Sequence, residues 1–191
     1  HRRLSILDLT ERGAQPMADC NGQLVLTYNG EIYNYVELRA ELKRLGHHFQ
    51  TGTDTEVILE AYKAWGTDCL QRFNGMFSFA LYDSLQDRLF CARDRYGEKP
   101  FLFAAQSDRF AFASEYKALL SLPWVASAHD ELRLVRGLYN PSSGLDNERE
   151  TVFCDISQLL PGEALLLDCR TLDRRIWHYW NLEPNSEFAA L

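Results

Sequence analysis

The segment MFSFALYD, residues 76–83, decides the fold class of this chain. If it is a strand, its apolar side chains alternate between two faces, with Phe77, Phe79 and Leu81 on one and Met76, Ala80 and Tyr82 on the other. A sheet with one solvent-exposed face would instead alternate polar and apolar residues. We therefore expect antiparallel strands covered on both sides, by another sheet on one side and by helices on the other.

Similar apolar segments lie on both sides of this strand along the chain. The turns SLQD, DRYGEK and QSD separate the next three, RLFCAR (88–93), PFLFAA (100–105) and RFAFAS (109–114). Further strands are expected at 3–9, 23–28, 151–153, 163–168 and 175–180. These strands and the helices described next predict the α+β class.

Two helices are predicted between the strand expected at 23–28 and the strand at 76–83. The first runs from an Asn34 cap, with Glu37 as its reciprocal partner, to Gly46. The second begins at the capping box Thr53–Glu56 and stops at Gly66. Shorter helices are expected from a Ser114 cap to 120 and over 130–139, with a loop at 141–144. The residues from Glu183 onward are typical of a linker.

The composition narrows the function classes. The chain has 191 residues, 46% of them hydrophobic and 13% aromatic, which predicts one packed domain. Its formal net charge of -7 argues against nucleic acid and against anionic membranes. We expect no membrane contact, because no apolar stretch approaches the roughly 20 residues that a span needs.

The five cysteines are scattered and form no CxxC pair, which argues against a metal site. Reduced thiols of a cytoplasmic protein are favoured over a disulfide scaffold. The cysteines are Cys20, Cys69, Cys91, Cys154 and Cys169.

The motif YNGEIYN, residues 28–34, is the first candidate site. Asn-Gly is typical of a hairpin turn, but the sequence that follows it predicts a helix, so we expect a turn from strand to helix. There the Asn29 side chain and the Gly30 backbone N–H could converge as two donors, as an oxyanion requires, with the Glu31 carboxylate beside them. The hairpin interpretation and the functional one both remain open on the pattern alone.

Two other motifs carry charges suited to a ligand. TGTDTE (51–56) is foremost a helix N-terminus, and the alternative is that Asp54 points its carboxylate at a ligand amine. In HRRLSILDL (1–9) Arg3 could bind a ligand carboxylate, although a surface arginine is the default. RDRYGEKP (93–100) is best explained as a tight turn, with Gly97 at positive φ and Pro100 opening an edge strand. His47 and His48 are expected to be a solvated pair.

Taken in order, these segments resemble the class II glutamine amidotransferase domain of glutamine-dependent asparagine synthetases. The ones that carry the resemblance are HRRLSILDL, GAQPM, YNGEIYNYVELR, TGTDTEVIL, FNGMFSFALYD, RDRYGEKPF and FASEYKALL, followed by LLPGEALLLD and WHYW. The resemblance covers nearly the whole chain. It implies a four-layer αββα sandwich of the N-terminal-nucleophile hydrolase type, here without its first strands.

The resemblance also implies a reaction. The family's nucleophile is a cysteine at the mature N-terminus, with its own α-amine as base; it attacks the side-chain amide of glutamine and releases ammonia. Carried onto this sequence, Arg3 would bind the α-carboxylate of glutamine, and Asp54, assisted by Glu31, its α-ammonium. Asn29 and Gly30 would form the oxyanion hole.

Two parts of that machinery are expected to lie outside the chain. No cysteine of this sequence aligns with the nucleophile, so the chain by itself is expected to be inactive, with a glutaminase domain at 1–182 and a linker at 183–191. No cofactor is expected in this domain; ATP and Mg²⁺ belong to a C-terminal synthetase domain, and the parent is compatible with a homodimer. The alternatives are a related amidotransferase with another acceptor and a non-catalytic ligand-binding or interaction module.

Overall fold

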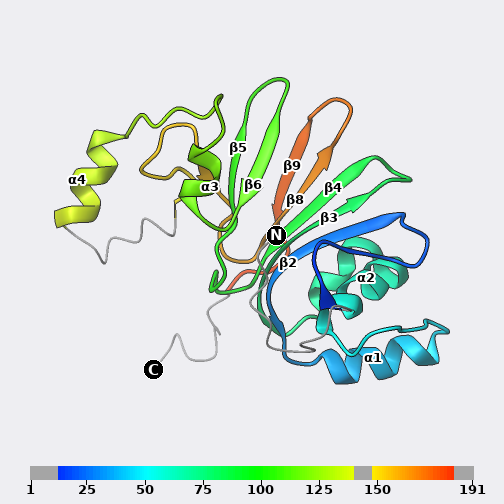
Figure 1. The fold of residues 1–191 in the computed structure, drawn as a ribbon. Coiled ribbons are helices and arrows are strands. Elements are labelled where there is room, and N and C mark those ends of the chain that lie inside the picture. Colours follow the sequence, from blue (N-terminus) through cyan, green and yellow to red (C-terminus); the bar gives the residue numbers. More distant parts are fainter. Residues whose placement is uncertain (1–12, 140–147, 183–191) are drawn as a thin grey trace, which may run out of the picture.

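The computed structural model describes residues 13–139 and 148–182, which form two antiparallel sheets with helices packed beside them (Figure 1). The predicted α+β class with antiparallel strands is confirmed. The strand predicted at 3–9, the loop at 141–144 and the linker from Glu183 all lie outside the described residues.

The larger sheet contains six strands in the order β1-β2-β3-β4-β8-β9. Its strands are Met17–Ala18 (β1), Leu24–Ile32 (β2), Gly75–Asp83 (β3), Arg88–Arg93 (β4), Glu163–Asp168 (β8) and Arg174–His178 (β9). β2 and β3 pair over their full lengths, with Leu24 opposite Asp83 and Ile32 opposite Gly75. β1 covers only Val25 and Leu26 on the other side of β2, so the second half of β2 has no neighbouring strand on that side among the described residues.

The smaller sheet has the order β6-β5-β7, with strands Leu102–Ala105 (β5), Phe110–Ala113 (β6) and Ser157–Gln158 (β7). Because β5 is the middle strand, the prediction that Pro100 opens an edge strand is wrong. The strand predicted at 151–153 is also wrong; Phe153 makes only an isolated bridge with His129.

Helices lie outside the two sheets (Figure 1). They are α1 (Tyr35–Arg44), α2 (Asp54–Trp65), α3 (Tyr116–Leu120) and α4 (Glu131–Tyr139), with the 3₁₀ helix η2 at Gly66–Gln71. In Figure 1, α1 and α2 lie on one side of the larger sheet, and the smaller sheet with α3 lies on the other. No helix in the two described ranges is long and apolar enough to cross a membrane.

The core confirms that β3 is covered on both faces. Phe77, Phe79 and Leu81 are buried in a cluster with α1 and α2, which contribute Leu42 and Ile58 among others. On the other face Ala80 is buried in a cluster between the two sheets with Cys91, Phe101 and Phe103. A third cluster, on the outer face of the smaller sheet, joins Leu119 of α3 to Leu102 and Ala104. At about 25 cal/mol per Å² of apolar area, these clusters are the main source of stability.

The expected turn at Asn29 and Gly30 is not found. Both residues lie inside β2, opposite Ser78 and Phe77 of β3, and the strand continues to Ile32. The backbones of the two strands approach closely here: a Cβ on Gly30, whose φ is +152°, would lie 2.1 Å from the Met76 carbonyl oxygen. Gly30 therefore permits a close approach of the β2 and β3 backbones, and the Asn-Gly pair does not form a turn.

The predicted helix caps are only partly confirmed. Thr53 Oγ1 accepts the Glu56 N–H at 3.2 Å, as the capping box requires, but the Glu56 carboxylate instead accepts the backbone N–H groups of Gln50 and Thr51. The Asn34 side chain does not cap α1; it bonds to Arg72 and Asn74 across the loop that precedes β3. Both bonds are long-range contacts, which a local cap pattern cannot show.

Three smaller expectations also have clear outcomes. Ser114 does not cap α3, whose N-cap is Glu115. His47 is not a solvated residue, because its Nδ1 lies 2.8 Å from Glu60 Oε2. Gly97 has the expected positive φ of 68°, and its turn is held by Asp94, whose carboxylate accepts N–H groups that include those of Tyr96 and Lys99.

Candidate functional site

Asp54 is the acidic residue at the start of α2, and its carboxylate is turned toward β2. Its Oδ2 accepts the Tyr28 hydroxyl at 2.7 Å and the Ile32 backbone N–H at 3.0 Å. The residue is only 5% exposed, and no hydrogen bond to its Oδ1 is found within residues 13–139 and 148–182. A buried carboxylate with one oxygen fully bonded and the other not is suited to receive a positively charged group.

Side-chain hydrogen bonds hold the loop before α2, and this fixes the position of Asp54. Arg39 of α1 donates from its two terminal nitrogens to the carbonyl oxygens of Thr51 and Thr53 at 2.6 and 2.7 Å. The Glu56 carboxylate holds the other side of the same loop. TGTDTE is thus a structured helix entry, as its simplest interpretation predicts, and within it Asp54 alone sends its carboxylate to β2.

The Gly30 N–H points to the open side of β2. Along β2 the N–H of Tyr28 bonds to Gln15 Oε1 and that of Ile32 bonds to Asp54, both away from β3, whereas Tyr33 N–H bonds to Asn74 at the start of β3. Backbone N–H groups alternate in direction along a strand, so Gly30 shares the direction of Tyr28 and Ile32. Its donor therefore lies between the two bonded groups, on the side where β1 no longer covers the strand.

Asn29 and Glu31 lie on the face of β2 opposite to Tyr28. Asn29 is half-buried and lines a pocket of about 160 Å³ between the sheets, together with Ser78, Phe101 and Ser114. Its Nδ2 makes a long contact of 3.4 Å with Ser114 Oγ, so its donor capacity is little used. Glu31 is half-buried next to it in sequence.

Electrostatics link the two carboxylates to one hydroxyl. Burial raises the pKa of Tyr28 far above its ordinary value, and the negative charges of Asp54 and Glu31 raise it further. The hydroxyl therefore remains a proton donor over the physiological range. The Glu31 charge thus acts on the Tyr28 hydroxyl, although the Glu31 side chain starts from the other face of β2.

The structure thus unites some of the predicted residues and separates others. Gly30 and Asp54 share the open side of β2, and Asn29 and Glu31 share the opposite face of the strand from Tyr28. No hydrogen bond joins Asn29, Glu31 and Asp54 to one another within the described ranges. Arg3 lies outside the described residues.

Two contributors are not predicted by the sequence. Tyr28 belongs to YNGEIYN, but the pattern assigns it only to a strand, although a buried tyrosine usually finds a partner for its hydroxyl. Arg39 ends the segment YNGEIYNYVELR, but the sequence pattern assigns it no role. No group of three metal-ligating side chains is found in the part of the chain that the structure describes.

The two antiparallel sheets and their helices define an α+β domain, and comparison with known proteins identifies the family. A family model described as "Glutamine amidotransferase domain" matches residues 1–180. The chain therefore belongs to the glutamine amidotransferase domain family.

Individual relatives agree with this assignment. The chain is 39% identical over 191 residues to asparagine synthetase [glutamine-hydrolyzing] 3 of Bacillus subtilis, covering 96% of this chain and 29% of that protein. It is 33% identical over 190 residues to amidase chry2 of Gibberella zeae, covering 99% and 27%. The chain spans less than a third of the length of either protein.

A solved structure supports the fold. The glutamine phosphoribosylpyrophosphate amidotransferase of B. subtilis matches with a TM-score of 0.55 at 21% identity, over 86% of this chain and 32% of that one. At this identity the likeness concerns the fold. The two antiparallel sheets with flanking helices are thus similar in fold to part of that amidotransferase.

Proposed function

We propose that this chain is the glutamine-hydrolysing domain of a glutamine-dependent asparagine synthetase, which supplies ammonia for the ATP-dependent conversion of aspartate to asparagine. The observation that carries the proposal is the Asp54 carboxylate on the open side of β2, which the Gly30 N–H also faces; within the described residues no hydrogen bond is found to Oδ1 or from this N–H. This arrangement offers an acceptor for an ammonium and a donor for an oxyanion. The substrate is suggested by the relatives, which are named for glutamine hydrolysis.

The binding mode follows from charge. The α-ammonium of glutamine would bind Asp54 Oδ1, with the Glu31 charge assisting, and its α-carboxylate would bind Arg3. The amide oxygen would lie near the Gly30 N–H and Asn29 Nδ2, where negative charge develops during attack on the amide carbon.

The nucleophile would be supplied by a cysteine at the mature N-terminus of the longer protein. Its thiolate would attack the amide carbon, ammonia would leave, and water would hydrolyse the thioester. The cysteines of this chain are poorly suited to that role. Burial raises the pKa of Cys69 and Cys91, which disfavours their thiolates, and no cysteine lines the pocket at Asn29.

The remaining parts of the reaction would belong to the rest of the parent protein. Aspartate, ATP and Mg²⁺ would bind a C-terminal synthetase domain in a cytoplasmic enzyme, which could form a homodimer. This domain would need no cofactor of its own.

The similarity to amidase chry2 favours one second candidate, a glutaminase domain that serves a different acceptor. The glutamine site and its chemistry would be unchanged, and only the ammonia acceptor would differ. Assaying the full-length protein with aspartate and with other carboxylates separates the two. A non-catalytic module would release no ammonia in either assay.

The experiment is a glutaminase assay on the full-length protein. Asn29→Ala should lower kcat about a hundredfold, because an oxyanion donor contributes about 3 kcal/mol. Asp54→Asn should raise the KM for glutamine at least tenfold. Asp108→Asn, at the exposed tip of the β5–β6 hairpin, is the matched control and should behave as wild type. Unchanged kinetics in both site variants would refute the proposal.

A further inference from the structure

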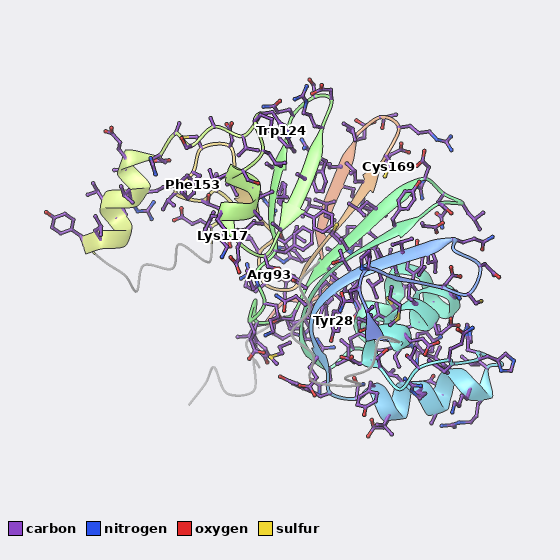
Figure 2. The ribbon with its side chains drawn as sticks, in the orientation of Figure 1. Tyr28, Arg93, Lys117, Trp124, Phe153 and Cys169 are labelled. Carbon is purple, nitrogen blue, oxygen red and sulfur yellow. The ribbon has the colours of Figure 1, made fainter. Side chains whose placement is uncertain are left out.

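Tyr28 is a buried side chain whose hydroxyl has a single hydrogen-bond partner in the part of the chain that the structure describes. Figure 2 shows Tyr28 on the side of β2 where α2 lies. It is 5% exposed, packs in the core with residues of the helices, and donates to Asp54 Oδ2 at 2.7 Å. Its pKa is raised by burial and by the adjacent carboxylates, so this donor stays protonated.

The carboxylate that it holds has another conformation available. Asp54 is the first residue of α2, directly after the Thr53 cap, where an acidic side chain is attracted to the unpaired N–H groups of its own helix. In the structure it bonds to none of them. Tyr28 and the Ile32 N–H draw Oδ2 to β2 instead, and this leaves Oδ1 for a ligand.

We propose that Tyr28 is a positioning residue for glutamine: its hydroxyl fixes Asp54 Oδ2 so that Oδ1 meets the α-ammonium. This inference deepens the proposed function and rests on it. It also makes Tyr28 a specificity determinant, because an ammonium is what distinguishes glutamine from an amide without an α-amino group.

The neighbouring contacts do not duplicate this role. Arg39 and Glu56 hold the backbone of the loop 50–53, and neither makes a hydrogen bond to the Asp54 carboxylate within the described residues. Among the described residues, only the Ile32 N–H donates to Oδ2 besides Tyr28, and one remaining hydrogen bond would leave the carboxylate free to rotate about it. Removing the hydroxyl should therefore misdirect Oδ1 while the loop and the core stay in place.

The test uses steady-state kinetics of the full-length protein with Tyr28→Phe. We expect the KM for glutamine to rise about tenfold while kcat changes less than twofold. Glutaramate lacks the α-ammonium. We therefore also expect the ratio of kcat/KM for glutamine to kcat/KM for glutaramate to fall by a similar factor. This ratio does not depend on the fraction of folded enzyme.

Tyr62→Phe is the matched control. Tyr62 is another buried tyrosine, on α2, and it lies away from the site. Its hydroxyl donates to a carboxylate oxygen, Asp83 Oδ2, over a distance of 3.2 Å. Its removal should change neither KM nor the glutamine-to-glutaramate ratio. An unchanged KM in Tyr28→Phe, or an equal rise in Tyr62→Phe, would overturn the inference.

The double variant separates this inference from the proposed function. If Tyr28 acts through Asp54, adding Tyr28→Phe to Asp54→Asn should raise KM less than twofold further. Full additivity would mean that Tyr28 acts independently, and would overturn the inference while leaving the proposed function intact. If Asp54→Asn alone leaves KM unchanged, the proposed function fails at Asp54 and the role of Tyr28 fails with it.

Discussion

Gly30 and Met76 lie so close across the β2–β3 pair that a Cβ on Gly30 would be 2.1 Å from the Met76 carbonyl oxygen. Gly75 repeats the arrangement from the other strand, where a Cβ would lie 2.1 Å from the Glu31 carbonyl oxygen. Two glycines on paired strands thus bring the backbones together at the point where the Gly30 N–H faces the open side of the sheet.

Gly30→Ala should therefore destabilise the protein by about 3 kcal/mol or more, because it combines a positive φ with a backbone clash. Gly22→Ala is the control: Gly22 also has a positive φ, +65°, but nothing lies within 4 Å of the point that its Cβ would occupy. That change should cost about 1 kcal/mol. Chemical denaturation of both variants measures the difference, and equal losses would show that the close approach has no energetic consequence.

Asp19 should make stability depend on acid pH. Its burial opposes the charged form, but the N–H groups of Leu24 and Gln23 and the ammonium of Lys63 outweigh this effect and lower the pKa. Because the folded pKa lies below the unfolded value of about 3.8, the contribution is complete above that value and is lost as pH falls through the folded pKa. Asp19→Asn should cost about 1–3 kcal/mol at pH 7 and less near pH 3, as followed by urea unfolding. A loss independent of pH would contradict this assignment.

Four of the five thiols should divide into two groups by their rate of labelling. Cys20 and Cys154 are exposed, whereas Cys69 and Cys91 are fully buried and have raised pKa values. A thiol reagent in native buffer should label the first pair within minutes and the second pair only on unfolding. Rapid native labelling of Cys91, identified by peptide mass, would show that the layer between the sheets opens readily.

Thr53→Ala should cost about 1 kcal/mol, because Thr53 Oγ1 caps α2 by accepting the Glu56 N–H. Thr67→Ala, in the 3₁₀ helix η2, is a comparison with the same change in side chain outside the cap. Thermal unfolding should show a lower midpoint for Thr53→Ala only. A matched decrease in both variants would argue against a specific cap.

The sequence predicts those parts of the fold that depend on a regular pattern. The alternation in β3 and the apolar stripe of α2 are local and strong, and both elements form as expected. The expected turn at Gly30 is wrong because the conformation there depends on Met76 of the paired strand, which no local pattern reveals. The Asn34 cap is wrong for the same reason, since the partners of this side chain are Arg72 and Asn74.

The candidate site shows the same division. Donor and charge types are enough to select Asn29, Gly30, Glu31 and Asp54, but not to show that they lie on different sides of β2. The role of Tyr28 cannot be predicted from the sequence, because its hydroxyl contacts Asp54 only when α2 is packed on the sheet. The prediction for Arg3 stays a prediction.

The most direct test of the central claim is a crystal structure of the full-length protein with glutamine bound. The account predicts the α-ammonium within hydrogen-bond distance of Asp54 Oδ1 and the amide oxygen at the Gly30 N–H and Asn29 Nδ2. Glutamine bound elsewhere, with Asp54 Oδ1 left without a ligand contact, would contradict it.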